Sequence, residues 1–346
     1  MVANLFATIL IVAIHYGGSD ISFGYDLNYF IQEAIANGIA RSAIPLFALI
    51  SGYFVLNKVS TFKEYRRTIS TKIHTLVVPY LAASILIFSS FAVKAIFKQE
   101  QGQLLNLSLI FNSIVAHPRS VQFWFLRDLI ILMIISPFLF NVNKYFYYGI
   151  GALLFVCWFM DIQLFPIVAG WYIVNVETIF FFWLGGTIFR SSFNFDALIF
   201  CKNTTKYIIT MAWFMVIAYR IYIDPDLSVW YTRNYTIESL ILYKLAILLG
   251  LINLLQLSSI VRKNKYLIYA SGLTFFVYLF HHFPLSSFIY HLTKRIIKAP
   301  YSFYINFPVA LVLVFLCAYI ASKYFSPFYT LVTGGRSPSK ALKRMT

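Results

Sequence analysis

The chain has 346 residues, of which 60% are hydrophobic and only 12% are charged. A soluble domain cannot bury that much apolar surface, so the composition excludes a soluble enzyme, a disordered chain and a secreted disulfide scaffold. The net charge of +16 is typical of loops that face an anionic membrane surface. No basic cluster is interleaved with aromatic residues in a polar segment, which argues against a nucleic-acid partner.

Ten apolar segments follow one another along the chain, and about 20 apolar residues suffice for one helix to cross a bilayer. Their continuity argues against a β-barrel, whose strands alternate. We therefore expect an all-α polytopic bundle of about ten transmembrane helices over residues 1–330, no soluble domain, and a basic cytoplasmic tail over 331–346. The expected spans are residues 2–17, 37–57, 73–97, 120–140, 145–161, 170–189, 204–223, 237–257, 267–290 and 302–325.

The loops between these spans differ in their basic residues. One alternating set holds 17 Lys and Arg residues and the opposite set holds 9. Basic loops stay on the cytoplasmic side, so we expect both termini to be cytoplasmic. The loop over 294–298 is a local exception, because this orientation places its three basic residues outside.

Ionisable side chains inside the expected spans are costly in a bilayer and mark function by default. At about 1.5 Å per residue from each span end, six of them fall in one layer of the outer half of the membrane: His15, Arg127, Asp128, Glu177, Lys244 and His281. Arg127 and Asp128 are adjacent, so we expect them to face different sides and to need separate partners. For the same reason we expect only one of His281 and His282 to reach the site.

These residue types suit proton transfer. A histidine takes up and returns a proton near neutrality, and a histidine–carboxylate pair suits the activation of a hydroxyl. A buried Arg or Lys suits an oxyanion or a phosphate. His15, His281 and Glu177 lack a ligand pair at metal spacing, so we expect no metal. The residues alone leave open an acyl- or proton-transfer enzyme and a transporter.

Several stretches resemble the integral-membrane acyltransferase family 3. The first span carries His15 in the position of that family's histidine, although Asn4 stands where the family has a basic residue. Lys72 precedes Pro79, where the family tends to carry two arginines before a proline. The other stretches that carry the resemblance are Pro45–Tyr53 with its Ser51-Gly52-Tyr53, Trp124–Leu129 followed by Ser136-Pro137, Phe182–Gly186, and Val277–His281.

The resemblance implies transfer of acetyl from cytoplasmic acetyl-CoA to a hydroxyl of a cell-surface glycan, such as a lipopolysaccharide O-antigen, at the outer side of a bacterial inner membrane. Acetyl-CoA is then the donor, no cofactor is bound permanently, and the acceptor is lipid-linked or polymeric. Two alternatives remain: a glycan or small-molecule exporter, and an acyltransferase that acts on a non-glycan acceptor.

The expected roles follow from this reading. His15 activates the acceptor hydroxyl, and the other expected catalytic residues are Arg127, His281 and Glu177. Basic residues on the cytoplasmic side hold coenzyme A, although topology control is an equally simple reason for them. The expected donor-binding residues are Lys72, Arg66, Arg67, Ser51 and Lys263, and the expected acceptor-binding residues are Arg41, Asp128, Trp124, Tyr278 and Lys244.

Overall fold

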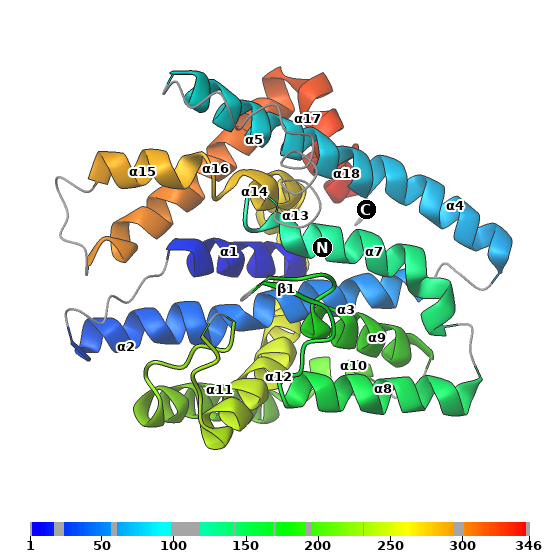
Figure 1. Cartoon of the computed structure of the whole chain (residues 1–346), viewed down its shortest axis with the longest axis vertical. Helices are drawn as coiled ribbons and strands as arrows, with labels where there is room; N and C mark the ends of the chain where they lie inside the picture. The colour runs from blue at the N-terminus through cyan, green and yellow to red at the C-terminus, as the bar shows by residue number, and fades with distance from the viewer. Residues whose placement is uncertain are drawn as a thin grey trace.

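The computed structural model describes residues 2–16, 24–56, 61–97, 118, 120–140, 143–168, 171–190, 195–230, 232–293 and 301–343. Its elements are helices and one short hairpin, so the expected all-helical fold is confirmed. Most of the long helices run roughly parallel across Figure 1, with α1 in the middle of the bundle. The continuous piece that contains α4 and α5 lies along one side of it.

In the first half of the chain, two pairs of helices are joined without a loop. A π turn and a 3₁₀ turn join the first pair, and a π turn alone joins the second. The elements are α1 (Val2–Tyr16), α2 (Leu27–Glu33), η2 (Ala34–Gly38), η3 (Ile39–Ser42), α3 (Ala43–Leu56), α4 (Phe62–Lys72), η4 (Ile73–Val77), α5 (Val78–Phe97), α7 (Phe123–Phe140) and α8 (Lys144–Phe159).

The second half begins with a hairpin of two antiparallel strands, β1 (Pro166–Val168) and β2 (Trp171–Tyr172), near the middle of the molecule (Figure 1). Helices follow from there to the end of the described residues. They are α9 (Val176–Arg190), α10 (Phe195–Ile199), α11 (Asn203–Ile223), α12 (Ile237–Ile260), α13 (Lys265–Ser271), α14 (Thr274–Phe280), α15 (Leu285–Thr293), α16 (Phe303–Tyr324), α17 (Ser326–Thr333) and α18 (Pro338–Lys343).

Within the described residues, five helical segments are long and apolar enough to cross a membrane. They are Leu27–Val55, Phe62–Val93, Asn203–Ile223, Ile237–Ile260 and Phe303–Tyr324, while Val2–Tyr16 and Lys144–Phe159 are apolar but shorter. The protein is therefore a helical membrane protein, and the span count of ten stays a prediction.

Four of the expected spans differ from the structure. The helix expected from residue 170 begins at Val176, because Trp171–Tyr172 form β2. The helix expected from residue 37 begins at Leu27, and the helix expected from residue 73 begins at Phe62. Polar residues extend both helices: Asp26 caps the first, and Thr61 forms a capping box with Glu64 at the second. The span expected over 267–290 is instead divided into α13, α14 and α15.

Helices α3 and α9 pack closely because glycines face each other's backbone. A Cβ atom on Gly52 would lie 1.8 Å from the Phe182 carbonyl oxygen. A Cβ atom on Gly185 would lie 1.9 Å from the Leu49 carbonyl oxygen. Small residues allow such close approach of membrane helices. This contact sets the position of α9, whose first turn carries Glu177.

The described part of the expected tail packs against the bundle. Val332 and Ala341 are buried, and α18 lies against α13. Arg336 donates a hydrogen bond to the Thr75 carbonyl at the junction with η4. Residues 331–343 therefore continue the helical packing, and residues 344–346 lie outside the described residues.

Candidate active site

Three histidines from two segments form a cluster, which we call the histidine cluster: His15, His281 and His282. The His15 ring at the end of α1 lies 5.1 Å from the His281 ring and 4.8 Å from the His282 ring, measured between centroids. His281 is fully buried, whereas His15 and His282 are half-buried. The Tyr16 hydroxyl donates to the His281 carbonyl at 2.8 Å, which ties the end of α1 to this segment.

The contacts of His281 define its tautomer. Its Nδ1 lies 3.1 Å from the Val277 carbonyl oxygen and 2.9 Å from the Tyr278 carbonyl oxygen. Carbonyl oxygens only accept, so Nδ1 carries the proton and Nε2 of the neutral ring is an acceptor. That Nε2 is buried and has no hydrogen-bond partner among the described residues. His281 therefore presents an acceptor nitrogen inside the bundle.

The expectation that only one of His281 and His282 reaches the site is wrong, because both rings lie against His15. Helix α14 ends at Phe280, and both histidines belong to the turn that follows it. His15 approaches this turn from another helix and contacts both rings.

The expectation that Arg127 and Asp128 need separate partners is also wrong. Arg127 Nε and Nη2 both donate to Asp128 Oδ1, at 3.0 and 2.9 Å. The long arginine side chain bends back to its neighbour although the two Cβ atoms point apart. Arg127 also donates to the Tyr172 carbonyl, and Asp128 accepts the amides of Val174 and Asn175. The pair therefore fixes the segment between β2 and α9.

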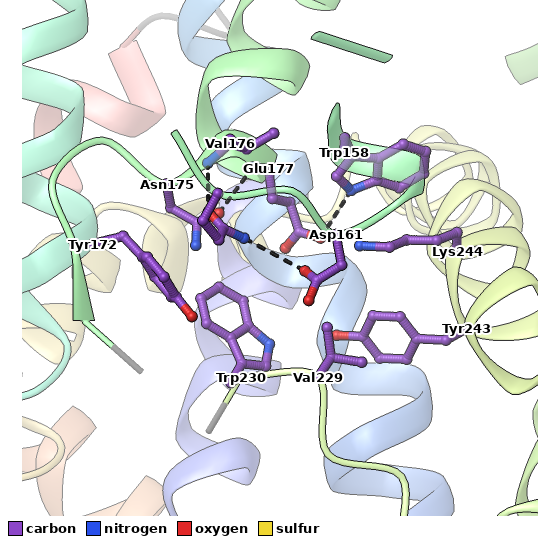
Figure 2. Close-up of a pocket in the computed structure, with 11 residues that line it drawn as sticks. Trp158, Asp161, Tyr172, Asn175, Val176, Glu177, Val229, Trp230, Tyr243 and Lys244 are labelled. Atoms are coloured by element: carbon purple, nitrogen blue, oxygen red, sulfur yellow. Dashed lines mark hydrogen bonds between the residues drawn. The ribbon is translucent and has the colours of Figure 1, made fainter. Parts of the chain in front are cut away.

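Glu177 and Lys244 meet in a second cluster beside a cavity with about 300 Å³ of empty volume, which includes open solvent. We call this cavity the acidic pocket. The Trp158 indole donates to Glu177 Oε2 at 3.1 Å, and the Lys244 ammonium lies 5.1 Å from the Trp158 ring centroid. Figure 2 shows Lys244 and Tyr243 entering from one side, and Tyr172, Asn175 and Trp230 from the other. The acidic residues Glu177 and Asp161 lie between them.

The expected polar layer is therefore divided into three pairs of neighbours: two histidines, Arg127 with Asp128, and Glu177 with Lys244. In the described part of the chain, neither His15 nor His281 bonds to Glu177. The described residues also contain no group of three His, Cys, Asp or Glu side chains placed to hold a metal ion.

The charge of Arg41 acts electrostatically on both His15 and Glu177. Its Nε donates to Asn37 Oδ1 at 3.0 Å, and Asn37 Nδ2 donates to Glu33 Oε2 at 2.7 Å. Glu33 forms a buried ion pair with Arg220 at 2.8 Å. A ladder of side chains at spacing i, i+4, i+8 thus holds Arg41 in place.

The remaining expected acceptor-binding residues belong to a chain of aromatic rings. The Trp124 ring lies 5.4 Å from the Trp230 ring in the acidic pocket and 5.8 Å from Phe125. Phe125 lies 6.4 Å from Tyr278, whose ring is 6.2 Å from His281. These contacts connect the two clusters.

The expected donor-binding residues lie on other parts of the fold. Arg66 and Arg67 are exposed on α4, and Lys72 is half-buried where that helix meets η4. Lys263 is exposed in the turn between α12 and α13, and Ser51 is half-buried in α3 beside Gly52.

Several site residues were not predicted from the sequence: Asp161, Asn175, Trp230 and Tyr243 in the pocket, and Glu33, Asn37 and Arg220 beneath Arg41. Glu33 lies before the span expected from residue 37, and Arg220 lies inside the span expected over 204–223. Their signal was the i+4 spacing of Glu33, Asn37 and Arg41, which places three polar side chains on one helix face.

Comparison with known proteins shows the family to which the chain belongs. Residues 4–323 match the acyltransferase domain family, so the chain belongs to a family of membrane acyltransferases. The chain is similar to the succinoglycan biosynthesis protein ExoH of Rhizobium meliloti (strain 1021), with 27% identity over 128 residues. That alignment covers 33% of each protein, so the matched part spans about a third of this relative's length. No solved structure matches the chain.

Proposed function

We propose that this protein transfers acetyl from cytoplasmic acetyl-CoA to a hydroxyl of a cell-surface glycan, of the O-antigen type, at the outer side of the bacterial inner membrane. The acyltransferase family supports the reaction class. The similarity to a protein named for succinoglycan biosynthesis supports a polysaccharide acceptor. This reaction needs a protein that reaches both sides of the membrane, which ten spans with both termini in the cytoplasm would provide. The unequal numbers of basic residues in the two sets of loops, 17 and 9, support this orientation.

The observation that carries the proposal is the pairing of His15 with His281. His281 is locked by two carbonyls and presents an acceptor nitrogen, while the half-buried His15 is the more accessible ring. A base whose orientation is fixed by a second polar group is the usual arrangement for activating a hydroxyl. His15 therefore acts as the base, and the His281 ring packs against it at 5.1 Å between centroids.

In the proposed reaction, His15 alone accounts for the proton that is taken up and returned. His15 takes the proton of the acceptor hydroxyl, and the hydroxyl oxygen attacks the thioester carbonyl carbon. The carbon–sulfur bond breaks, and His15 returns the proton to the leaving coenzyme A sulfur. Arg41, which interacts electrostatically with His15, stabilises the negative charge that develops on the carbonyl oxygen. The exposed arginines of α4 hold the coenzyme A phosphates at the cytoplasmic side.

The test uses the protein in proteoliposomes with acetyl-CoA labelled in the acetyl group and glycan extracted from the host cells. Label should appear in the glycan with the wild-type protein. His15→Gln keeps hydrogen bonding but carries no proton, so label transfer should fall by about 10²–10⁴-fold. His74→Gln, at an exposed position of η4, is the matched control and should transfer normally. Near-normal transfer by His15→Gln would remove His15 from the base role, and glycan crossing the bilayer without label would favour an exporter.

A further inference from the structure

We infer that Arg336 is a positioning residue for the acyl donor. It fixes the π turn η4 and thereby the direction in which α4 presents its basic side chains. This inference rests on the proposed function, in which the exposed arginines of α4 hold the coenzyme A phosphates. It gives the C-terminal segment over 331–343, the expected tail, a part in donor binding.

The element that contains α4 and α5 has a proline near the point where its two helices join. Pro79 is the second residue of α5, and a proline carries no amide hydrogen. It therefore cannot donate to the Thr75 carbonyl four residues earlier, and in a regular α-helix its ring would crowd that carbonyl. The chain forms the π turn η4 at this place, where the Val78 amide donates to the Ile73 carbonyl five residues earlier. Membrane helices accommodate proline by such local turns and by donors from neighbouring segments.

Arg336 supplies a donor of this kind. Its Nη1 donates to the Thr75 carbonyl oxygen at 2.5 Å and to the Thr333 carbonyl oxygen at 2.8 Å. Its guanidinium also lies 4.0 Å from the centre of the Phe275 ring, which is a cation–π contact. Phe275 belongs to α14, the helix that ends directly before His281. One side chain thus connects η4, the tail and the helix that leads to the histidine cluster.

The backbone of the tail is shaped for this contact. Gly334 ends α17 with a left-handed backbone at a φ value of 61°, which glycine adopts without strain. A Cβ atom on Gly334 would lie 2.5 Å from Thr75 Cα, so the two backbones meet closely here. Helix α17 packs against both α5 and α14, and Figure 1 shows it beside α5. Tyr329 in α17 donates to the Gly272 carbonyl at 3.1 Å, which fixes the same helix from the other side.

The geometry of η4 decides where the basic residues of α4 lie. Lys72 is the last residue of α4 and directly precedes the π turn. A π turn closes its hydrogen bond one residue further along than an α-helical turn, and one residue corresponds to about 100° of rotation around a helix. If η4 relaxed to a regular α-helix, Lys72, Arg66 and Arg67 would turn by about that angle relative to α5. Single π turns inside helices are frequent at functional sites.

The contact between the tail and η4 also agrees with the side of the membrane on which the donor is proposed to bind. The basic residues of the loops favour a cytoplasmic position both for residues 58–72 and for the tail. The hydrogen bond from Arg336 to the Thr75 carbonyl requires the two segments to lie on the same side. Arg336 is therefore placed to act on the donor end of the bundle.

The experiment compares Arg336→Gln with Arg190→Gln in proteoliposomes. Arg336→Gln removes the guanidinium, so the apparent KM for acetyl-CoA should rise by about three- to tenfold while the KM for extracted glycan stays unchanged. Arg190→Gln is the matched control, because Arg190 also lies over an aromatic ring, 5.4 Å from the Tyr147 centroid at the end of α9. It should change neither KM value. Arg336→Lys keeps a cation that can donate to one carbonyl, so it should raise the donor KM by a smaller factor, and it serves if Arg336→Gln does not insert.

Pro79→Ala tests the contact with the Thr75 carbonyl. Alanine returns an amide to position 79, and that amide can donate to the carbonyl. Arg336→Gln should therefore lower the melting temperature less in the Pro79→Ala protein than in the wild type, as thermal unfolding in detergent measures. An equal loss in both backgrounds would show that Arg336 does not act through Thr75, and it would overturn the inference.

Equilibrium binding of labelled coenzyme A, measured without glycan, separates this inference from the proposed function. Binding that weakens in Arg336→Gln, together with no label transfer to glycan by the wild type, would keep the positioning role and refute the proposed reaction. Label transfer with an unchanged coenzyme A affinity and donor KM in both Arg336 variants would do the reverse. A glycan KM that rises as much as the acetyl-CoA KM would also overturn the inference, because it would indicate a general loss of structure.

Discussion

The crossing of α3 and α9 gives a prediction with a magnitude taken from the structure. In Gly185→Ala, the new Cβ atom would lie 1.9 Å from the Leu49 carbonyl oxygen, whereas ordinary van der Waals contact begins at 3.4 Å. The helices would have to separate by about 1.5 Å, and a backbone atom cannot rotate away as a side chain can. Overpacking of this kind costs about 1–3 kcal/mol of unfolding free energy, and a rigid backbone contact favours the upper end.

The matched control is Gly149→Ala in α8, where a Cβ atom would meet nothing within 4 Å. Alanine is the better helix former, so this variant should gain about 0.5–1 kcal/mol. Thermal unfolding of both variants in detergent measures the difference. Gly52→Ala, on the other side of the crossing, should behave like Gly185→Ala. A Gly185→Ala protein as stable as Gly149→Ala would refute the reasoning, because it would mean that α3 and α9 do not approach so closely.

Two further predictions concern charged residues. Arg220→Met removes the cation that offsets the buried charge of Glu33, so it should lower the unfolding free energy by about 3–5 kcal/mol. Glu33→Leu combined with Arg220→Met should restore most of that loss, and thermal unfolding in detergent measures both variants. An equal loss in the single and double variants would contradict the pairing. Arg66→Gln with Arg67→Gln should raise the KM for acetyl-CoA and leave the glycan KM unchanged, because both side chains are exposed on α4. Steady-state label transfer measures both constants, and poor membrane insertion as the sole effect would favour a role in topology.

Hydropathy predicted the all-helical membrane fold because helices in a bilayer require long uninterrupted runs of apolar residues. It missed the helix that begins at Leu27 because Gln32 and Glu33 look like loop residues. Both are buried, and the Arg220 partner that offsets the charge of Glu33 comes from a helix far along the chain. The start of this helix depends on an ion pair between residues far apart in the sequence, so the residues around Leu27 alone do not predict it.

The candidate site was also only partly predictable from the sequence. His15, Glu177 and Lys244 stand out because charge inside a span is costly. Asn175, Tyr243 and Trp230 do not, because polar aromatic and amide residues near helix ends are common in membrane proteins. The position of Asn175 depends on the segment between β2 and α9, which Asp128 holds through two backbone amides. That interaction could not be read from the adjacent charges of Arg127 and Asp128.

The ladder beneath Arg41 explains why the bundle contains buried charge outside the two clusters. An unpaired charge in such a bundle is expensive, and Glu33 offsets Arg220. The Asn37 amide has one end on Glu33 and the other on Arg41, so its orientation is fixed from both sides. Arg41 Nε and Nη2 both donate to Asn37 Oδ1, a two-nitrogen contact that a lysine has no means to make. The ladder therefore holds a positive charge that acts on both His15 and Glu177, and the proposed acyl transfer would develop negative charge that this arginine could stabilise.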